Sequence, residues 1–383
     1  MSRNLKIVHS VPSVAVTDGG TSYVVCALAS AQAVDLNTSV HIVARRHDSV
    51  RNLAPSANVA MHEISSVWPK CHFETHKLLE KICTGDGTVV HDHGIWNSQN
   101  YACTSYALRH KLPYVVSTHG MLRPWALAYK PLKKRVARWL YQDHLLNNAS
   151  CIMAASEIEL DGLRQAGFKN SIAVVPIGID SSIPELPRTI PTSPRIVLCL
   201  SRIHPKKGLI HAIEAWNALR PKGWRLNIVG PSECKHREAL EGIVNTYGLQ
   251  NEITFFDPVY GVSKYQLFYD ADFFLLPTYG ENFGVVVAEA LACKLPVLTT
   301  VGTPWKELIA RRCGWFIDIG TAPLIEALEQ VFKTEIAELK RMGERGHQWV
   351  VQEFQWQKIS RQSIAVYDWL LQRGSKPDFV YRW

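Results

Sequence analysis

Short runs rich in Val, Ile, Leu and Phe alternate with segments of helical apolar spacing through both halves of the chain. The first half predicts strands over 5–11, 40–46, 87–93, 112–118, 149–156 and 172–178, and the second half over 195–202, 224–230, 252–257, 271–278 and 295–301. Continuous apolar strands separated by amphipathic helices are typical of parallel sheets covered on both faces. Two such series predict an α/β chain with two doubly wound parallel-sheet domains.

A segment with the composition of a linker separates the two series. Residues 179–195 hold four prolines, and proline-rich stretches between folded units favour an extended, exposed backbone. We therefore expect an N-terminal domain over 1–180, a linker over 181–194 and a C-terminal domain over 195–356. The length of 383 residues agrees, because it exceeds what one ordinary core accommodates.

The end of the chain predicts two helices, over 336–354 and 356–372. The second is apolar enough that it must dock on a folded surface, and the first domain is one candidate. At the other end, residues 1–13 have too short an apolar run for a secretory signal and predict an opening strand.

The composition is that of a globular protein, with 47% hydrophobic and 20% charged residues. No run of 18 apolar residues predicts a helix that spans a membrane. Nine cysteines, without a C-x-x-C pair or a Cys/His cluster at zinc spacing, favour free thiols in a reducing cytoplasm over disulfides or structural zinc.

The net charge of +8 is concentrated in one window. Residues 93–142 contain no Asp or Glu but hold eight basic residues, which are Arg109, Lys111, Arg123, Lys130, Lys133, Lys134, Arg135 and Arg138. A local positive field indicates an anionic partner on one face rather than general nucleic-acid binding.

Two carboxylates end an almost wholly apolar run in the stretch YGENFGVVVAEA, residues 279–290. An ionised Glu281 or Glu289 would be costly there without a partner. If a helix occupies about 284–292, its first-turn N–H groups form an anion site beside Glu281, and Glu289 can accept hydrogen bonds from a diol such as ribose. The three valines weaken this helix prediction. The alternative is a loop acid at a helix start and a buried acid paired with a core Arg or Lys.

The stretch SRIHPKKG, residues 201–208, lies between a predicted strand and a predicted helix. Such a turn stands at the carboxyl edge of a parallel sheet, where these folds bind ligands. Arg202 and Lys207 could contact a diphosphate from there. The alternative is a solvated helix start, although basic residues at a helix N-terminus oppose its dipole and need a reason.

Three further candidates follow predicted strands of the first half. Gly19 and Gly20 permit close approach to a phosphate, or simply make a turn. His91 and His93 end one strand and His119 follows another, which favours polar binding or proton handling, with structural histidines as the alternative. A zinc site at His91 and His93 lacks further ligands at suitable spacing.

Two other patterns bear on the class of protein. Asp270 and Asp272 resemble a metal–nucleotide pair, but they end a helix and open a strand, so a capping role fits better. The chain has neither the G-x-x-x-x-G-K-[ST] loop nor the G-x-G-x-x-G fingerprint, so kinase and dehydrogenase functions lose their main support.

Residues 125–146 predict one basic amphipathic helix, with Leu132, Val136, Trp139 and Leu140 on an apolar face. Such a helix suits an anionic membrane surface or an anionic acceptor. The alternative is a domain helix whose basic side faces solvent.

Taken together, SRIHPKKG, ADFFLLPTYGENFGVVVAEALACKLPVLTT and DGGTSYVV resemble the GT-B retaining glycosyltransferases of glycosyltransferase family 4, group 1. The E-x7-E signature falls on Glu281 and Glu289, and Arg-x4-Lys-Gly falls on Arg202, Lys207 and Gly208. STHGMLRPWAL, GTPWKEL and KPDFVYRW look like a bacterial subgroup that builds surface polysaccharides. The resemblance runs nearly end to end.

The resemblance implies two Rossmann-like domains that face a cleft, with a helix at about 357–383 crossing back to the first domain. It implies transfer of a sugar from a UDP- or GDP-sugar to a glycan or polyprenyl-diphosphate-linked acceptor in O-antigen, exopolysaccharide or capsule synthesis. The expected setting is the cytoplasm, with an anionic membrane surface as a further partner. No cofactor, metal or nucleic acid is expected.

Residue roles are implied in the same way. Those expected at the catalytic centre are His119, Glu281, Arg202 and Lys207. The donor diphosphate would meet Gly19, Gly20, Arg202, Lys207 and Val285, and the donor sugar Glu281, Asn282, Phe283 and Gly284. The ribose would meet Glu289, the base Pro258 and Val259, and the acceptor side His93 and Arg123.

The chain departs from the family pattern at three positions, where Lys294 and Asp257 replace usual glycines and Ile177 replaces an asparagine. The departure at Asp257 leaves recognition of the base open. Two alternatives to transfer remain, a nucleotide-sugar epimerase or hydrolase of the same fold, and a non-catalytic nucleotide-sugar binding module.

Overall fold

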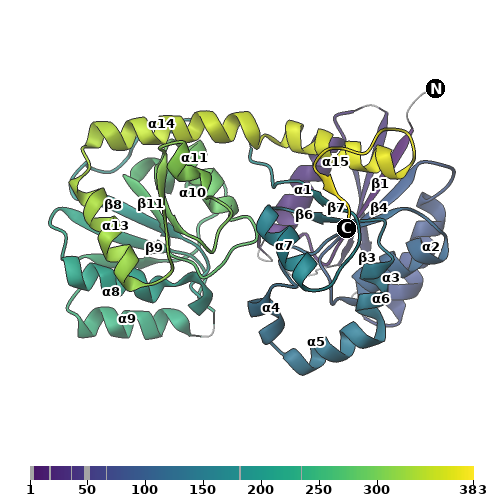
Figure 1. Ribbon diagram of the computed structural model, residues 1–383, viewed down its shortest axis with the longest axis horizontal. Coiled ribbons are helices and arrows are strands. Elements are labelled where there is room, and N and C mark those ends of the chain that lie inside the picture. Colours follow the sequence, from purple (N-terminus) through teal and green to yellow (C-terminus); the bar gives the residue numbers. More distant parts are fainter. Residues whose placement is uncertain are drawn as a thin grey trace. The chain divides into compact units, whose positions relative to one another are not determined.

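The computed structural model describes residues 4–16, 19–35, 37–46, 52–65, 67–180, 183–233 and 235–383. The chain divides into two compact units, Met1–Gly178 with Trp356–Trp383, and Ile179–Gln355 (Figure 1). Residues 181–182 of the expected linker and Asp18 of the DGGTSYVV motif lie outside the described residues. Residues 183–194 form neither helix nor strand.

The first unit is built on an eight-stranded sheet in the order β14-β7-β6-β5-β4-β1-β2-β3, parallel except where β14 pairs with β7. The strands are β1 (Leu5–Val11), β2 (Thr38–Arg45), β3 (Val59–Ile64), β4 (Thr88–His93), β5 (Tyr114–Ser117), β6 (Cys151–Ala154), β7 (Ile172–Val174) and β14 (Val380–Tyr381). The strand order reverses between β1 and β4, which is where such sheets open a ligand site.

Helices cover both faces of this sheet. One face packs against α2 (Lys70–Ile82), α3 (Ser98–Arg109), α6 (Asp143–Asn147) and α7 (Glu157–Gln165). The other is covered by α1 (Gly20–Gln32) and α15 (Trp356–Leu370), which pack on each other. Along β1 and β4, Val8 and Val90 enter the first core, and the alternating His9 and His91 face α1 and α15. The apolar helix over 356–372 therefore docks on the first unit, as its composition requires.

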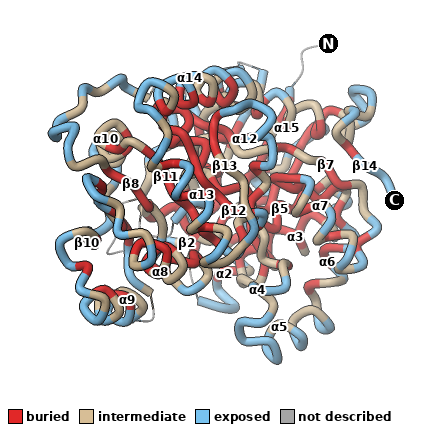
Figure 2. The backbone as a smooth tube through the Cα atoms, turned by 60° about the vertical axis from the view of Figure 1, so that its left-hand side comes forward, coloured by how far each residue is buried: buried red, intermediate tan, exposed pale blue. Residues whose placement is uncertain are grey.

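The second unit has a six-stranded parallel sheet in the order β10-β9-β8-β11-β12-β13. Its strands are β8 (Arg195–Leu200), β9 (Trp224–Val229), β10 (Ile253–Phe256), β11 (Phe273–Leu276), β12 (Val297–Thr300) and β13 (Gly314–Ile317). Figure 2 shows β11 and β12, two interior strands of this sheet, as buried tubes. The order reverses between β8 and β11, so the α/β prediction of two doubly wound sheets is confirmed.

The second sheet is also covered on both faces. One face packs against α8 (Leu209–Leu219), α9 (His236–Thr246) and α13 (Thr321–Lys333). The other faces α10 (Val262–Asp270), α11 (Val285–Ala292) and α14 (Ile336–Glu353), with α12 (Glu307–Ala310) leading into β13. The predicted helix over 336–354 corresponds to α14.

The sequence pattern missed three strands. β3 carries polar His62 and Glu63 at a sheet edge, β13 opens with Gly314, and β14 has two residues. Each gives a weak apolar alternation, so neighbouring strands rather than local pattern determine these elements.

The single helix predicted over 125–146 is wrong. The segment forms α4 (Pro124–Ala128), α5 (Pro131–Ala137), a π-helical turn at Arg138–Gln142, and α6. Pro131 explains the break, because the residue before a proline avoids the helical region and Lys130 takes φ 52°. The expected apolar face does not enter a core: Leu132 is 76% exposed and Trp139 is 83% exposed, and Val136 and Leu140 are also exposed.

Asp270 and Asp272 serve a structural purpose. The Asp272 carboxylate accepts hydrogen bonds from Arg188 Nη1 and Nη2, both at 2.9 Å, and from the Ile196 N–H at 2.8 Å. Asp270 accepts the Thr189 N–H and hydroxyl. The two carboxylates therefore hold the segment that enters β8, a role that the sequence-based capping prediction did not include.

The eight cysteines among the described residues are free thiols. Cys26, Cys151, Cys199 and Cys293, which lie in apolar stretches of the sequence, are buried. No helix in the described ranges has the length and apolar character needed to cross a membrane.

Lys294 occupies a backbone conformation that suits glycine. It follows α11 with φ 60° and pairs with the partly exposed Glu185 and Glu344. We expect Lys294→Gly to be more stable than Lys294→Ala by about 1 kcal/mol, because both lose weak ion pairs and only glycine relieves the left-handed strain. Urea denaturation of the two variants measures the difference. Equal stabilities would show that the backbone at this position is unstrained.

Candidate functional site

Two loops meet at the carboxyl edge of the second sheet, where the strand order reverses. One follows β8 and contains a short 3-10 turn at Pro205–Lys207, and the other joins β11 to α11. Gly208 makes this meeting possible: it has φ 64°, and a Cβ there would lie 2.0 Å from the Pro277 carbonyl oxygen. The glycine of the Arg-x4-Lys-Gly pattern is therefore required by a close backbone approach.

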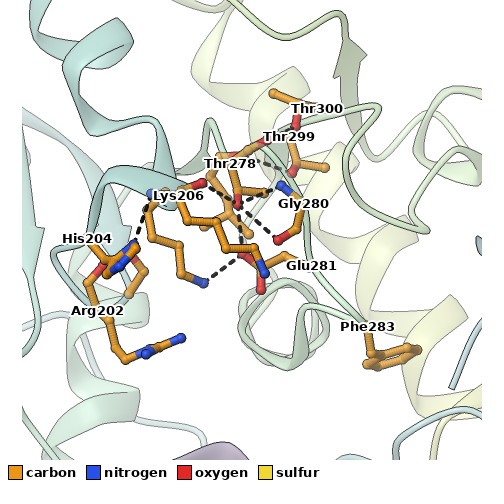
Figure 3. Close-up of polar contacts among 12 residues, drawn as sticks. Arg202, His204, Lys206, Thr278, Gly280, Glu281, Phe283, Thr299 and Thr300 are labelled. Carbon is orange, nitrogen blue, oxygen red and sulfur yellow. Dashed lines mark hydrogen bonds and ion pairs between the residues drawn. The ribbon is translucent and has the colours of Figure 1, made fainter. Parts of the chain in front are cut away.

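Lys207 and Glu281 form an ion pair in this edge, with Nζ donating to Oε1 at 2.7 Å. Their side chains are only 11% and 14% exposed. The Thr278 hydroxyl donates to the same oxygen at 2.9 Å and accepts the Gly280 N–H at 3.2 Å. Figure 3 shows Thr278, Gly280 and Glu281 gathered together, with Arg202 and His204 on one side and Phe283 on the other.

Burial raises the pKa of the Glu281 carboxyl, but the charge and hydrogen bond of Lys207 outweigh burial and bring the pKa below its usual range. Glu281 is therefore ionised at neutral pH and can accept hydrogen bonds from hydroxyl groups. A buried pair of this kind is costly to desolvate, and removing either partner leaves a buried charge.

The 279–284 loop is held from both sides. The Tyr279 N–H donates to the Lys206 carbonyl and the Glu281 N–H to the Gly302 carbonyl, both at 2.9 Å. Phe283 points into a core with Trp305, whose Nε1–H donates to the Phe283 carbonyl at 2.6 Å. The side chain of Phe283 is thus structural, and any ligand contact from it must come through the backbone.

Helix α11 begins at Val285, after Gly284 with φ 78°. Its valines prefer strands, but Val287 and the following residues are buried against β11, β12 and α14, and this packing overrides the local preference. The helix prediction is confirmed. In its first turn the Val287 N–H donates to the Gly284 carbonyl at 2.8 Å, while the N–H groups of Val285 and Val286 precede any intrahelical acceptor.

Arg202 is half-exposed and its Nη1 donates to Glu233 at 2.7 Å. The sequence analysis did not identify Glu233. Glu289, in contrast, is buried in α11 and accepts from Lys264 Nζ at 2.6 Å. For Glu289 the structure therefore shows the pairing with a lysine that was the alternative to ribose binding.

Pro258 and Val259 follow β10 in an exposed loop, next to Asp257, which pairs with Arg237 at 2.8 Å. Asp257 therefore anchors this loop to α9, where the family usually has glycine. Arg202, Lys207, Glu281, Asn282, Phe283, Gly284, Val285 and Glu289 all lie in the loops and helix of this one edge.

In the first unit, Gly19 caps α1 with φ 87° and Gly20 is its first residue. A Cβ on either glycine would meet no atom within 4 Å, so open space lies in front of this turn. Arg123 caps the short helix α4.

His93, the last residue of β4, lies beside His119, which follows β5. His93 Nδ1 is 3.1 Å from His119 Nε2. His119 has φ 48°, and Glu159 fixes its neighbours by accepting the Thr118 hydroxyl and the Gly120 N–H at 2.7 Å. Burial lowers the pKa of His119, with the Glu159 carboxylate acting in the opposite direction. A cavity of about 30 Å³ adjoins His91, His93 and His119.

The prediction that a zinc site at His91 and His93 lacks a third ligand is wrong. In the folded chain His9 of β1 comes beside them, and one nitrogen from each of the three rings lies within 4.8 Å of the others. The register pairing of His9 with His91 on β1 and β4 brings these side chains together. No spacing rule detects this, because the two strands are 80 residues apart in sequence.

Two family descriptions match the chain. "Glycosyltransferase Family 4" matches residues 18–183, and "Glycosyl transferases group 1" matches residues 187–349. Together they cover most of both units.

Curated relatives agree. WcaL of Escherichia coli, named for colanic acid biosynthesis, is 29% identical over 236 residues, 58% of this chain and 57% of WcaL. The GDP-mannose:cellobiosyl-diphosphopolyprenol alpha-mannosyltransferase of Xanthomonas campestris is 28% identical over 78% of this chain and 79% of its own. The chain thus spans little more than half the length of WcaL.

Solved structures share the fold. Sucrose-phosphate synthase from Thermosynechococcus elongatus has a TM-score of 0.81 at 19% identity, covering 96% of this chain and 99% of that one. HepE of Anabaena, solved with UDP-glucose, has a TM-score of 0.72 at 18% identity over 94% of this chain and 99% of its own. Nothing in these comparisons favours an epimerase, a hydrolase or a binding module.

Proposed function

Because the chain belongs to the group 1 glycosyltransferases of family 4, we propose that it moves a sugar from a nucleoside-diphosphate sugar to a glycan or polyprenyl-diphosphate-linked acceptor in surface-polysaccharide synthesis. The observation that carries this proposal is the buried Lys207–Glu281 pair at the β8/β11 edge, beside the first turn of α11. A cation, a fixed carboxylate and free N–H groups at one edge suit a diphosphate and a hydroxylated sugar.

The donor diphosphate is assigned to Lys207, Arg202 and the N–H groups around Val285, with Gly19 and Gly20 as further contacts from the first unit. As the bond to the sugar breaks, negative charge builds on the departing diphosphate. Groups that are already oriented stabilise this charge without reorganising. Arg202 would exchange its exposed partner Glu233 for the diphosphate, which is a modest cost because the pair is half-exposed.

The donor sugar is assigned to ionised Glu281 and to the backbone of Asn282, Phe283 and Gly284. Glu289 is assigned to the ribose, and Pro258 and Val259 to the base. For Glu289 this requires Lys264 to share or release the carboxylate. We propose uracil or guanine as the base, because one relative is named for GDP-mannose and one fold neighbour was solved with UDP-glucose.

We propose retention of the anomeric configuration by attack on the face from which the leaving group departs. A double displacement would need a carboxylate nucleophile. The buried acid nearest His119 is Glu159, and both of its oxygens already accept backbone or hydroxyl hydrogens, from Thr118, Gly120 and Ala155. His119 is assigned to the transferred sugar, and His93 and Arg123 to the acceptor side.

A transfer assay tests the function. UDP- and GDP-sugars are incubated with the protein and with polyprenyl-diphosphate-linked or free glycan acceptors, and products are analysed by mass spectrometry and NMR. Sugar joined to an acceptor in the α configuration from an α-linked donor supports the proposal. Release of free or epimerised sugar only, at the same rate with and without acceptor, would contradict it.

We also propose that the α4–α5 segment docks the protein on an anionic bilayer at the cytoplasmic face of the membrane. Trp125, Tyr129, Leu132, Val136, Trp139 and Leu140 are exposed apolar side chains of this segment. They are interleaved with Lys133 and Arg135, also exposed, and Figure 2 shows α5 largely pale blue. Exposed Trp and Leu next to basic residues suit a bilayer interface with anionic lipid.

Lys133→Glu with Arg135→Glu is expected to reduce co-sedimentation with phosphatidylglycerol vesicles at least tenfold, since each basic residue near such a surface contributes about 1 kcal/mol. The matched control is Lys222→Glu with Arg225→Glu, the same charge change on exposed residues of the second unit. Equal loss in both variants, or none in either, would remove the assignment of this segment.

A further inference from the structure

A line of hydrogen bonds runs through the first unit from Gln32, the last residue of α1, to His119. Gln32 Oε1 lies 2.7 Å from His9 Nε2, and His9 Nδ1 lies 2.9 Å from His93 Nε2. His93 Nδ1 then lies 3.1 Å from His119 Nε2. Gln32, His9 and His93 are fully buried, so water does not compete for these contacts.

The orientation of the Gln32 amide is set from α15. Gln32 Nε2 donates to the Ser363 hydroxyl at 2.8 Å, and that hydroxyl donates its own hydrogen to the Ser360 carbonyl at 2.8 Å. Because Ser363 has spent its only hydrogen, it can only accept from Gln32. The amide oxygen must therefore face His9.

A carbonyl oxygen facing His9 determines which nitrogen carries the hydrogen in every ring along the line. Burial lowers the pKa of His9 to about 4, and the pKa of His93 also falls well below its usual range, so both rings are neutral at pH 7. A neutral imidazole has one donor and one acceptor nitrogen. His9 donates from Nε2 to Gln32 and accepts at Nδ1 from His93, and His93 accepts at Nδ1 from His119 Nε2–H.

His91 belongs to a side branch with a different end. Tyr367 lies 2.6 Å from His91 Nδ1, and His91 Nε2 lies 2.9 Å from the Ser117 hydroxyl. This branch satisfies His91 without contacting His93 or His119 through a hydrogen bond. Tyr367 also accepts from Gln32 Nε2 at 3.4 Å, so Ser117, whose hydroxyl contacts His91 and no member of the line, is the comparison residue.

The same histidines could be considered for a metal ion, but their geometry favours the hydrogen-bonded line. The His91 and His93 ring centroids are 4.0 Å apart with the ring planes tilted by 33°. A metal ion takes the lone pair of an unprotonated ring nitrogen, so it would have to displace hydrogen bonds that these rings already make. Both ring nitrogens of His9, His91 and His93 already have a hydrogen-bond partner.

We infer that Gln32 is a positioning residue that acts through His9 and His93 to hold His119 in the tautomer with hydrogen on Nε2 and an acceptor at Nδ1. This inference rests on the proposed function, in which His119 faces the transferred sugar. An acceptor nitrogen there can take a hydrogen bond from a sugar or acceptor hydroxyl, whereas the other tautomer would present an N–H that can only donate to the hydroxyl oxygen. The partner of one ring nitrogen sets the chemistry of the other.

Two substitutions of Gln32 separate the possibilities. Gln32→Glu offers only acceptor atoms to His9 and keeps the direction of the line. Gln32→Lys offers only donors and reverses it, so His119 would carry its hydrogen on Nδ1. Both place a charge at the same buried position, so they share a cost in stability, and Gln32→Met removes the bias without a charge. Ser117→Ala, which removes only the hydroxyl on His91 Nε2, is the control that leaves the line intact.

Long-range ¹H–¹⁵N NMR of histidine-labelled protein reads the tautomers directly, and the separate pair His41–His62 on β2 and β3 is an internal reference. We expect Nε2-protonated His119 in the wild type, Gln32→Glu and Ser117→Ala, and Nδ1-protonated His119 in Gln32→Lys. If Gln32→Lys does not fold, Gln32→Met should show a mixture of the two forms. An unchanged His119 tautomer in the folded Lys or Met variant would overturn the inference, as would stoichiometric zinc retained by the purified protein.

Transfer kinetics distinguish a failure of the inference from a failure of the proposed function. With the tautomer reversed, kcat should fall about 100-fold while the donor KM changes less than about twofold, because Lys207, Arg202 and α11, the charged and helix-start contacts assigned to the diphosphate, lie in the other unit. A reversed tautomer with unchanged kcat would support the effect of Gln32 on the His119 tautomer but remove the role of His119 in transfer. Loss of kcat in Ser117→Ala as large as in Gln32→Lys would show that both act by general structural damage.

Discussion

Replacing Lys207 with alanine is expected to lower kcat/KM for transfer about 100- to 1000-fold. The ammonium group is the most buried cation at the β8/β11 edge among the residues assigned to the diphosphate, and loss of one preoriented charge contact to a leaving group costs this much in enzymes. Steady-state assays with saturating acceptor measure the effect. Lys222→Ala, an exposed lysine at the opposite end of β9, is the matched control and should leave transfer unchanged.

The same change has a predicted effect on stability that must be separated from chemistry. Lys207→Ala leaves Glu281 buried without its cation, which costs roughly 3 kcal/mol. In the double variant Lys207→Met with Glu281→Gln, both charges are absent and most of this stability should return, while transfer stays abolished. Transfer at the wild-type rate in either folded variant would refute the role assigned to Lys207.

Acidification is expected to destabilise the first unit steeply between pH 6.5 and pH 4. Burial lowers the pKa of His9 from 6.5 to about 4, and the pKa values of His91 and His93 fall well below 6.5. In this window the unfolded chain binds protons that the folded state excludes, so the free energy of unfolding falls as pH falls. Each group contributes about 1.4 kcal/mol per pH unit.

One buried acid acts in the opposite direction. Burial raises the pKa of Asp92 to about 7, although Asn100 donates to its carboxylate at 2.7 Å. The folded state therefore binds a proton on Asp92 more readily than the unfolded chain, and stability from this group rises as pH falls from 7 toward 3.8. His9, His91 and His93 against Asp92 leave a net loss of about 3 kcal/mol for each pH unit between pH 6 and pH 5. His41 and His119 of the same unit, whose pKa values burial also lowers, add to this loss.

Urea denaturation at a series of pH values, followed by tryptophan fluorescence, measures this slope. His93→Asn should make it shallower by about 1.4 kcal/mol per pH unit. A stability that is flat from pH 7 to pH 5 would show that these histidines are not held neutral by burial.

Much of the fold could be predicted from the sequence, because both sheets are parallel and covered on two faces. Strands such as β8, β11 and β12 are then continuous apolar runs, which are visible without any partner. β3, β13 and β14 could not be predicted, since a polar edge strand, a strand opened by glycine and a two-residue strand have no such run. The break at Pro131 was predictable from the proline itself, and the apolar residues around it were wrongly read as one face.

The candidate site was predictable as a set of residues and not as a set of contacts. Glu281 and Lys207 were identified from their positions after strands, but their pairing depends on β8 lying next to β11. Glu233, Lys264 and Thr278, which contact Arg202, Glu289 and Glu281, carry no pattern of their own. The same holds for Gln32 and His9, which meet His93 only because β1 pairs with β4 and α15 packs on α1.

The structure of the protein bound to its nucleoside-diphosphate sugar tests the central claim most directly. The account predicts the diphosphate against Lys207 Nζ, the Arg202 guanidinium and the first turn of α11, with Glu281 on the sugar hydroxyls. A diphosphate bound elsewhere in the chain, with the Lys207–Glu281 pair untouched, would contradict it.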